Sequence, residues 1–191
     1  MDDIQLVLGS KSPRRKELVK HLGFPVEVRV DEVEEIYPVD IDNESVPEYL
    51  AKLKAMNLVK TLDTNEILIT SDTVVIFGEE ILGKPTDRQD AINMLRKLSG
   101  HQHDVISGVY LYGMGKESLF SVKTEVIFDE LSLADIEEYV DTWKPFDKAG
   151  SYGIQDWIGY IGIKGIKGCY YNVMGLPVNE IYNQLNRHFL S

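Results

Sequence analysis

The hydrophobic positions of this chain alternate between short apolar runs and helical spacings, which predicts a fold of mixed strands and helices. The first apolar run, residues 4–8, predicts a buried strand, and the spacing over residues 16–22 predicts a helix after it. Ser12 is a good N-cap residue and Pro13 suits the first helical position, so we expect the helix to begin there. The sequence therefore predicts a strand-to-helix turn at residues 10–15.

The same pattern predicts the later elements. The turn residues between two apolar runs indicate an antiparallel hairpin, and Ser45 and Ser132 each open a sequence typical of a capping box. We expect Ser71-Asp72-Thr73 to interrupt its strand, and the glycine-rich stretch 150–168 gives no clear boundaries. The expected strands are residues 26–30, 66–77, 104–112 and 118–128, and the expected helices are residues 45–62, 87–98, 132–142 and 176–189.

Composition indicates a soluble globular protein, with 43% hydrophobic and 27% charged residues in 191. We expect one domain over residues 1–191, with room for two lobes. No apolar run approaches the roughly 20 residues that span a bilayer, and the start, Met-Asp-Asp, lacks the basic region of a secretory signal. A single cysteine, Cys169, fits a reducing cytoplasm. The net charge of −11 argues against stable nucleic-acid binding and favours a small phosphorylated ligand bound with metal ions.

Residues 10–15 combine two hydroxyls and two arginines at the positive end of the predicted helix. Free backbone N–H groups, the helix dipole and guanidinium groups all favour a bound anion, especially a phosphate. A capped surface helix with two solvated arginines explains the same residues equally well. Both interpretations stay open on this segment alone.

Asp72 is a carboxylate inside an apolar stretch, where it needs an ion pair, a hydrogen bond or a metal. We favour a functional role over a turn cap, because four apolar residues follow the triplet directly. Glu35 closes an acidic cluster that could bind Mg²⁺ or Mn²⁺, although an exposed acidic loop is the simpler interpretation. Lys54 and Lys84 are candidate phosphate ligands, but lone lysines are usually solvated.

Residues 147–155 join two charged side chains, two glycines and the amide of Gln155. An amide can read donors and acceptors on a base, and an ordinary polar loop is an equally good interpretation. His101 and His103 could share one face of a strand, but a solvated strand start is favoured over a metal site.

Six segments taken in order resemble the Maf family of nucleoside triphosphate pyrophosphatases. Any one of them could occur by chance, whereas six in sequence along nearly the whole chain are specific. They are Ser10-Lys11-Ser12-Pro13-Arg14-Arg15, Leu53-Lys54-Ala55, Ser71-Asp72-Thr73-Val74-Val75, Gly83-Lys84-Pro85, residues 147–155, and Val173-Met174-Gly175-Leu176-Pro177.

The resemblance implies an α/β fold with a mixed β-sheet, flanking helices and two lobes around a cleft, like that of the inosine triphosphate pyrophosphatases (Maf/Ham1). It implies hydrolysis between the α- and β-phosphates, giving a nucleoside monophosphate and pyrophosphate. It also implies a divalent metal cation, Mg²⁺ or Mn²⁺, and a homodimer as a common state. The positions that it marks are Asp72 as the catalytic proton acceptor and metal ligand, Glu35 as an acidic catalytic or metal-binding residue, and Ser10, Arg15, Lys54 and Lys84 at the phosphates.

Arg14, Thr73 and Gln155 stand where the branches of the family differ, and here they look like the branch acting on dTTP and UTP. Modified pyrimidine nucleotides are further candidate substrates. Asp156 departs from the family pattern, in which glycine commonly follows the glutamine. Two alternatives remain: a non-catalytic nucleotide-binding regulator of cell division or septum formation, and a pyrophosphatase of the 7-methyl-GTP type.

Overall fold

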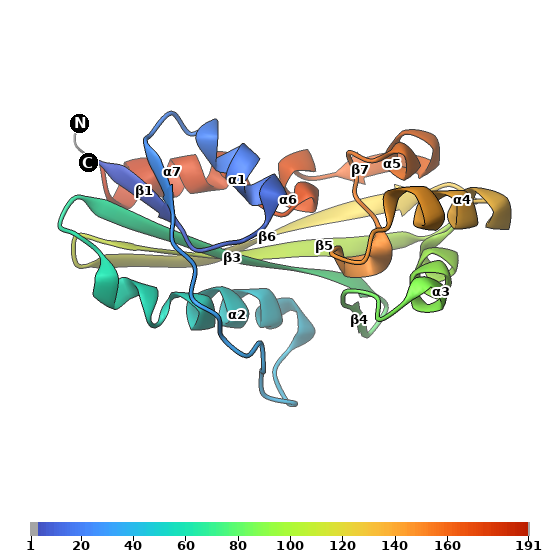
Figure 1. The fold of residues 1–191 in the computed structure, drawn as a ribbon, viewed down its shortest axis with the longest axis horizontal. Coiled ribbons are helices and arrows are strands. Elements are labelled where there is room, and N and C mark those ends of the chain that lie inside the picture. Colours follow the sequence, from blue (N-terminus) through green and yellow to red (C-terminus); the bar gives the residue numbers. More distant parts are fainter. Residues whose placement is uncertain (1–3, 191) are drawn as a thin grey trace. The chain divides into compact units, whose positions relative to one another are not determined.

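The computed structural model describes residues 4–190, and its elements alternate as the sequence predicts (Figure 1). In chain order they are β1 (Gln5–Leu8), α1 (Pro13–Lys20), β2 (Val26–Val28), the 3₁₀ turn η1 (Asn43–Ser45), α2 (Val46–Ala55), the 3₁₀ turn η2 (Leu58–Thr61), β3 (Glu66–Phe77), β4 (Glu80–Leu82), α3 (Arg88–Leu98), β5 (Gln102–Gly113), β6 (Lys116–Phe128), α4 (Leu133–Trp143), the 3₁₀ turn η3 (Ala149–Ser151), α5 (Trp157–Gly162), β7 (Ile163–Lys167), α6 (Tyr170–Met174) and α7 (Val178–His188).

The strands form one mixed sheet, which within residues 4–190 has seven strands in the order β2-β1-β3-β5-β6-β7, with β4 paired to β3. β1 is parallel to both β2 and β3, whereas β4 pairs antiparallel to β3 and β7 antiparallel to β6. β5 and β6 are neighbours joined by Met114-Gly115, which confirms the predicted hairpin. The predicted mixed sheet with flanking helices is confirmed.

The chain forms two compact units, each built from separate stretches of sequence. Described residues 4–72, 107–122 and 175–190 belong to unit 1, and residues 73–106 and 123–174 belong to unit 2. The boundary along β3 falls between Asp72 and Thr73, and β5 and β6 also contribute to both units. The single domain over residues 1–191 and the cleft between two lobes stay predictions.

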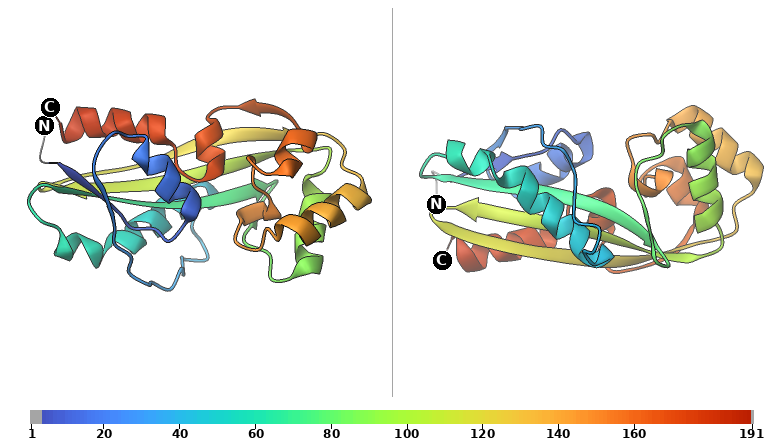
Figure 2. Two further views of the ribbon diagram at one scale, coloured as in Figure 1. Left: turned by 45° about the horizontal axis from the view of Figure 1, so that its top comes forward. Right: turned by 90° about the horizontal axis from the view of Figure 1, so that it is seen from below.

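In unit 1, helices cover both faces of the parallel strands: α2 lies on one face, and α1 and α7 lie on the other (Figures 1 and 2). Val7 and Leu68 are opposite each other in the β1–β3 register and pack against Ala51 and Ala55 of α2, together with Tyr110. Neighbouring side chains along a strand point to the other face. Burial on both faces explains why β1 reads as a continuous apolar run.

In unit 2, α3, α4 and α5 share one core with the strands. Leu95, Phe128, Tyr139 and Ile158 are at most 1% exposed and belong to one cluster. Asp87 and Ser132 cap α3 and α4 as predicted, because each side chain accepts a hydrogen bond from the N–H three residues later.

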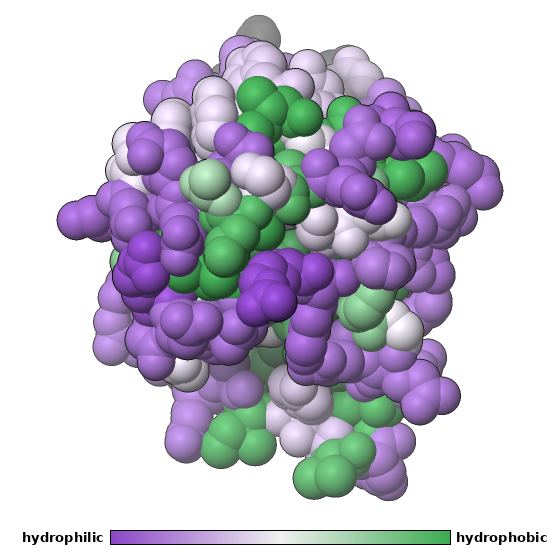
Figure 3. Space-filling view, turned by 90° about the vertical axis from the view of Figure 1, so that its right-hand side faces the viewer, coloured by the Kyte–Doolittle hydropathy of each residue, from purple (hydrophilic) through white to green (hydrophobic). Residues whose placement is uncertain are grey.

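Figure 3 shows one face of the molecule, on which hydrophilic side chains dominate and hydrophobic ones form separate patches. Scattered apolar side chains of this kind are normal on a protein surface. Among the described residues, none of the helices combines the length and the apolar character that crossing a membrane requires.

Four local predictions are wrong. Ser45 has helical backbone angles (φ −88°, ψ −16°) instead of the extended ones of a capping serine, and within residues 4–190 its hydroxyl makes no cap bond. The helix that follows ends at Ala55, and residues 58–61 of its expected continuation form the separate turn η2. β3 runs unbroken through Asp72, so the triplet is a polar segment of a continuous strand.

His103 is the fourth correction, because it is buried and not a solvated strand start. It is 3% exposed, its Nε2 is hydrogen-bonded to the Tyr152 hydroxyl at 2.7 Å, and both rings contact Phe128 edge-on. The side chain therefore belongs to the core of unit 2.

Candidate active site

The carboxyl end of β1, beside the middle of β3, is the point of unit 1 where a ligand site is expected. The connection from β1 to β2 uses α1, and the connection from β2 to β3 uses α2 on the opposite face of the sheet (Figure 1). In open sheets of this kind ligands bind at the carboxyl ends of the strands where the connections change face. Ser10 follows β1 and Asp72 lies on β3 beyond Ile69, the partner of Leu8. The topology therefore places both predicted residues at this point.

The loop from β1 to α1 is closed by its own hydroxyl groups. The Ser10 hydroxyl accepts a hydrogen bond from the N–H of Ser12 at 3.2 Å, and the Ser12 hydroxyl accepts one from the N–H of Arg15 at 3.4 Å. Pro13 occupies the first turn. These contacts confirm the predicted start of the helix, and they give the buried Ser10 a role in shaping the loop.

Arg15 connects this loop to two distant backbone segments of unit 1. Its Nε donates to the carbonyl of Gly175 at 2.8 Å and its Nη1 donates to the carbonyl of Ser71 at 2.6 Å. Burial lowers the pKa of the guanidinium, while the negative charge of Asp72 acts in the opposite direction and the neighbouring Arg14 acts with burial. Arg15 therefore joins three of the six sequence segments beside the carboxylate of Asp72.

Lys54 lies between two carboxylates. Its Nζ is 2.5 Å from Oδ1 of Asp72 and 3.0 Å from Oε1 of Glu35. The side chains of Asp72 and Lys54 are 12% and 15% exposed, whereas that of Glu35 is 47% exposed. The carboxylate inside the apolar strand is thus paired, as its burial requires. One lysine therefore links two carboxylates in unit 1, namely those of Glu35 and Asp72.

Arg14 lies half-buried in α1 of unit 1, and the other predicted residues belong to unit 2. Thr73 lies half-buried on β3, and Lys84 is exposed in the loop after β4. The N–H of Gly150 donates to the carbonyl of Gly83 at 3.0 Å, which ties the lysine loop to residues 147–155. Gly150 has φ +65°, and a Cβ there would lie 3.0 Å from Val75. Any side chain at position 150 would therefore be strained, and glycine is favoured where residues 147–155 meet the lysine loop and Val75.

Gln155 is half-buried in unit 2 and its amide nitrogen donates to Oδ1 of Asp156 at 3.2 Å. The other carboxylate oxygen of Asp156 accepts a hydrogen bond from the hydroxyl of Tyr139 at 2.8 Å. The structure thus brings Arg15, Glu35, Lys54 and Asp72 together in unit 1, and it separately connects the segments of Lys84 and Gln155 in unit 2.

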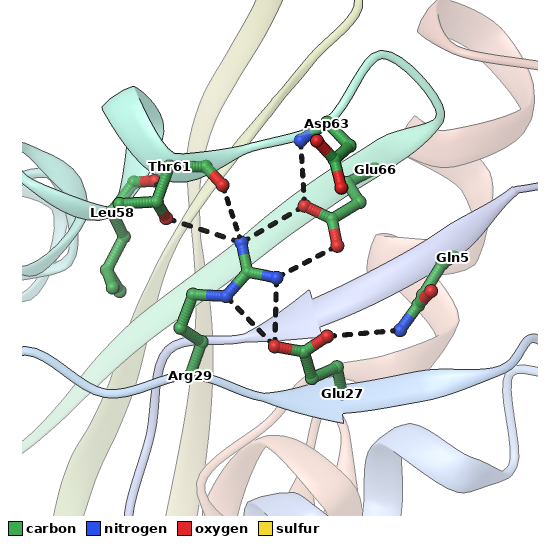
Figure 4. Close-up of polar contacts among 7 residues, drawn as sticks. All are labelled: Gln5, Glu27, Arg29, Leu58, Thr61, Asp63 and Glu66. Carbon is green, nitrogen blue, oxygen red and sulfur yellow. Dashed lines mark hydrogen bonds and ion pairs between the residues drawn. The ribbon is translucent and has the colours of Figure 1, made fainter.

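A charged cluster that the sequence does not predict connects β2, the strand before Glu35, to β3 (Figure 4). Arg29 donates from both terminal nitrogens to Glu66 at 2.9 and 3.0 Å, from Nε to Glu27 at 2.9 Å, and from Nη1 to the carbonyl of Thr61 at 2.9 Å. The hydrogen bond from Arg29 lowers the pKa of Glu66 and raises that of the guanidinium. No spacing in the sequence marks these residues as partners, because they come from different elements.

Farther along the same segment, the amide of Asn57 donates to the carboxylate of Asp31 at 2.7 Å, and Lys11 forms an ion pair with Glu32. Together with the Lys54–Glu35 pair, these contacts hold the acidic segment 31–35 at several points. They account for how a segment without regular structure presents Glu35 to Lys54.

The comparisons with known proteins agree with this fold. The family described as Maf-like protein matches residues 5–188. A dTTP/UTP pyrophosphatase of Phocaeicola vulgatus is 47% identical over 188 residues, which cover 98% of this chain and 97% of that protein. A dTTP/UTP pyrophosphatase of Bacteroides thetaiotaomicron is 45% identical over 188 residues, with the same coverage.

Among solved structures, that of the Staphylococcus aureus Ham1 protein matches with a TM-score of 0.56 at 14% identity, covering 96% of this chain and 98% of that one. This likeness confirms the predicted class of fold. With the family match over residues 5–188 and relatives at 45–47% identity, the chain belongs to the Maf family.

Proposed function

We propose that this chain is a nucleoside triphosphate pyrophosphatase that hydrolyses dTTP and UTP to the nucleoside monophosphate and pyrophosphate. The observation that carries the proposal is the paired, nearly buried Asp72 on β3, just beyond the carboxyl end of β1, in a chain 45–47% identical to proteins named dTTP/UTP pyrophosphatase. Modified pyrimidine nucleotides are further candidate substrates.

Asp72 positions the attacking water and accepts its proton. A carboxylate suits this role because it only accepts hydrogen bonds when it is ionised, and Lys54 at 2.5 Å compensates its charge. As the bond between the α- and β-phosphates breaks, charge develops on the leaving pyrophosphate and must be neutralised. Within unit 1, Lys54 and Arg15 supply positive charge for this purpose, and Ser10 shapes the loop that carries Arg15. Lys84 stays a predicted phosphate ligand, and Arg14 stays a predicted determinant of the nucleotide.

A divalent cation completes the charge balance. Glu35 and Asp72 carry two negative charges against the two positive charges of Lys54 and Arg15, so these four residues leave a triphosphate without compensation. Mg²⁺ is usually held by one or two carboxylates together with substrate phosphates, and Glu35 with Asp72 fits that donor set. When bound, the ion supplies charge neutralisation at the phosphate oxygens.

The test is pyrophosphate release from a panel of nucleoside triphosphates with Mg²⁺ or Mn²⁺. We expect release from dTTP and UTP, and Asp72→Asn should lower kcat by about 10²–10⁴-fold, the usual contribution of a general base. The control is Asp141→Asn, which removes one carboxylate of an exposed ion pair with Arg88 and should leave kcat unchanged.

Each alternative has its own outcome in this assay. Release from none of the triphosphates would contradict the proposal and favour a nucleotide-binding regulator of cell division. Preference for 7-methyl-GTP would contradict the substrate assignment. Activity of Asp72→Asn equal to wild type would contradict the assigned role of Asp72. A homodimer and the absence of stable nucleic-acid binding stay predictions that sedimentation and filter binding can address. A cytoplasmic location also stays a prediction.

A further inference from the structure

The ammonium group of Lys54 lies between the two carboxylates that fit a divalent cation. Its Nζ is 2.5 Å from Oδ1 of Asp72 and 3.0 Å from Oε1 of Glu35. Because one atom contacts both oxygens, the two carboxylates point to the same place. One or two carboxylates are the protein ligands that Mg²⁺ usually takes together with substrate phosphates. In the free protein, the ammonium of Lys54 therefore lies in the place that the cation needs.

Burial holds the ammonium in this place. The side chains of Lys54 and Asp72 are both largely buried, and a carboxylate so far removed from water needs a counter-charge. Ala51 and Ala55, on the same helix α2, are at most 1% exposed and pack in the core of unit 1. The backbone that carries Lys54 is thus fixed, and a change of partner involves only its side chain.

The charges around this place are balanced by protein groups. Lys54 and Arg15 carry two positive charges against the two negative charges of Glu35 and Asp72. A divalent cation that approaches these four groups meets no excess negative charge, and the ammonium repels it at short range. Such repulsion is strong between charges that are shielded from water. We therefore expect the free protein to bind the cation weakly at these carboxylates.

A nucleoside triphosphate changes this balance. It brings several negative charges, and its phosphate oxygens accept charge-assisted hydrogen bonds from an ammonium. The lysine ammonium is a compact charge on a flexible stem, so it can turn from the carboxylates to the phosphates. This turn leaves Glu35 and Asp72 open to the cation that the triphosphate carries. One lysine thus neutralises the carboxylates before the nucleotide binds and the phosphates afterwards.

We propose that Lys54 occupies the position of the divalent cation in the free protein, so that the substrate is the complex of the cation with the nucleotide. The inference rests on the proposed function for the nucleotide and for the cation. It means that the protein does not take up a metal ion first and the nucleotide second. Both arrive together, and the phosphates draw Lys54 away from Glu35 and Asp72.

The experiment measures Mn²⁺ binding to the protein without nucleotide, by the electron paramagnetic resonance signal of unbound Mn²⁺. Lys54→Met removes the ammonium and leaves both carboxylates, so the affinity for Mn²⁺ should rise at least about tenfold over wild type, the effect of one hydrogen bond to a charged group. Adding Glu35→Gln to Lys54→Met should cancel this gain, because it removes one of the two ligands.

The matched control is Lys52→Met. It makes the same change of charge on the same helix, at an exposed residue paired with Glu117, and should leave the affinity for Mn²⁺ unchanged. An unchanged or weaker affinity in Lys54→Met would overturn the inference. An equal gain in Lys52→Met would also overturn it, because it would indicate a general effect of charge.

The direction of the change separates the inference from simple damage to the site. Lys54→Met takes one cation from the phosphates and should lower kcat/KM, while its affinity for Mn²⁺ rises. A distorted site would lose both activity and Mn²⁺ binding, and that result would contradict the inference.

If Lys54→Met does not fold, thermal unfolding of the wild-type protein provides the test. About 1 mM Mn²⁺ alone should shift the midpoints of wild type and Glu35→Gln by the same amount, because the cation does not reach Glu35. Mn²⁺ with α,β-methylene-UTP, which is not hydrolysed between the α- and β-phosphates, should raise the midpoint of wild type more than that of Glu35→Gln. A rise with Mn²⁺ alone that Glu35→Gln abolishes would overturn the inference.

Mn²⁺ binding needs no turnover, so the inference and the proposed function fail separately. Pyrophosphate release by wild type, with an affinity for Mn²⁺ that Lys54→Met does not change, would support the pyrophosphatase and overturn the role of Lys54. A gain in affinity in Lys54→Met that Glu35→Gln cancels, in a protein that releases pyrophosphate from none of the triphosphates, would contradict the enzymatic proposal and support the place of Lys54 at the cation position.

Discussion

Lys54 and Lys52 stand two positions apart on α2 and occupy different environments. Lys54 is 15% exposed and contacts both Glu35 and Asp72, whereas Lys52 is 51% exposed and lies 3.6 Å from Glu117 at the surface. Their identical chemistry makes them a matched pair for separating the site from general charge effects.

Lys54→Met should lower kcat/KM for UTP by about 10²–10³-fold, the range found when one preorganised electrostatic contact is removed. It leaves Asp72 without its counter-charge and takes one cation from the phosphates. The measurement is steady-state pyrophosphate release. Lys52→Met is the control and should keep the wild-type kcat/KM, because exposed ion pairs contribute little. Equal losses in the two variants would argue against a specific role for Lys54.

His103 should make the stability of the protein depend on pH. Burial lowers the pKa of His103 to about 4, against 6.5 for the ordinary side chain, and Asp104 opposes this shift. Between these values the unfolded chain binds a proton that the folded chain does not, so stability falls as pH falls from 6.5 toward 4. The loss approaches about 3 kcal/mol, at 1.36 kcal/mol per pKa unit.

The measurement for His103 is urea unfolding at several pH values, in wild type and in His103→Gln. The variant has no imidazole to titrate, so the difference in unfolding free energy between the two proteins should shrink as pH falls from 6.5 to 4. A difference that stays constant over this range would show that His103 titrates normally in the folded protein.

At the scale of single elements, the two predicted capping boxes differ in the structure and therefore in energy. Ser132→Ala should destabilise the protein by about 1 kcal/mol, because the hydroxyl accepts from the N–H of Asp135 at 3.1 Å. Ser45→Ala should leave stability nearly unchanged, because Ser45 has helical backbone angles. Denaturant midpoints at constant m-value measure both. Equal costs would mean that Ser45 caps α2 in solution.

These two serines also show how far the sequence can predict the fold. Where a short apolar run or a cap residue acts on its own segment, as at β1, α1 and the hairpin of β5 and β6, the pattern predicts the element. Ser45 is a residue type that caps helices, but here it is the last residue of the turn η1, so its backbone angles are helical, and the local sequence pattern does not show this. α5 and β7 lie in a glycine-rich stretch whose structure depends on packing with β6.

In the candidate site too, the sequence predicts what depends on residue type and not what depends on distant contacts. The sequence could single out Asp72 because a carboxylate within an apolar run needs a partner, and its partner proves to be Lys54. It could not predict that Arg15 binds the carbonyls of Ser71 and Gly175, since every residue has a carbonyl and these lie 56 and 160 positions away. A contact to a distant backbone group does not depend on the type of the residue that supplies the group, so the sequence does not predict it.

At the scale of the whole molecule, the two units share strands and neither is continuous in sequence. β3, β5 and β6 each contribute residues to both units. Unfolding of one unit therefore disrupts three strands that continue into the other unit. We therefore expect a single cooperative unfolding transition, with equal calorimetric and van't Hoff enthalpies. Such a transition is what the prediction of one domain over residues 1–191 requires.

Tryptophan fluorescence offers a direct test, because both tryptophans of the chain, Trp143 and Trp157, belong to unit 2, where their rings stack 5.4 Å apart. A change in their fluorescence therefore reports the unfolding of unit 2.

The variant Arg29→Met acts in unit 1. It leaves the carboxylate of Glu66, only 5% exposed, without its main partner, and should lower the free energy of unfolding by about 3 kcal/mol. If the molecule unfolds as one, the fluorescence transition of unit 2 shifts by the same free energy as the far-UV circular dichroism transition. Arg88→Met, which breaks the exposed pair with Asp141 in unit 2, is the control and should shift neither. A fluorescence transition that stays in place while the circular dichroism transition moves would mean that the units unfold separately, and would contradict the prediction of one domain.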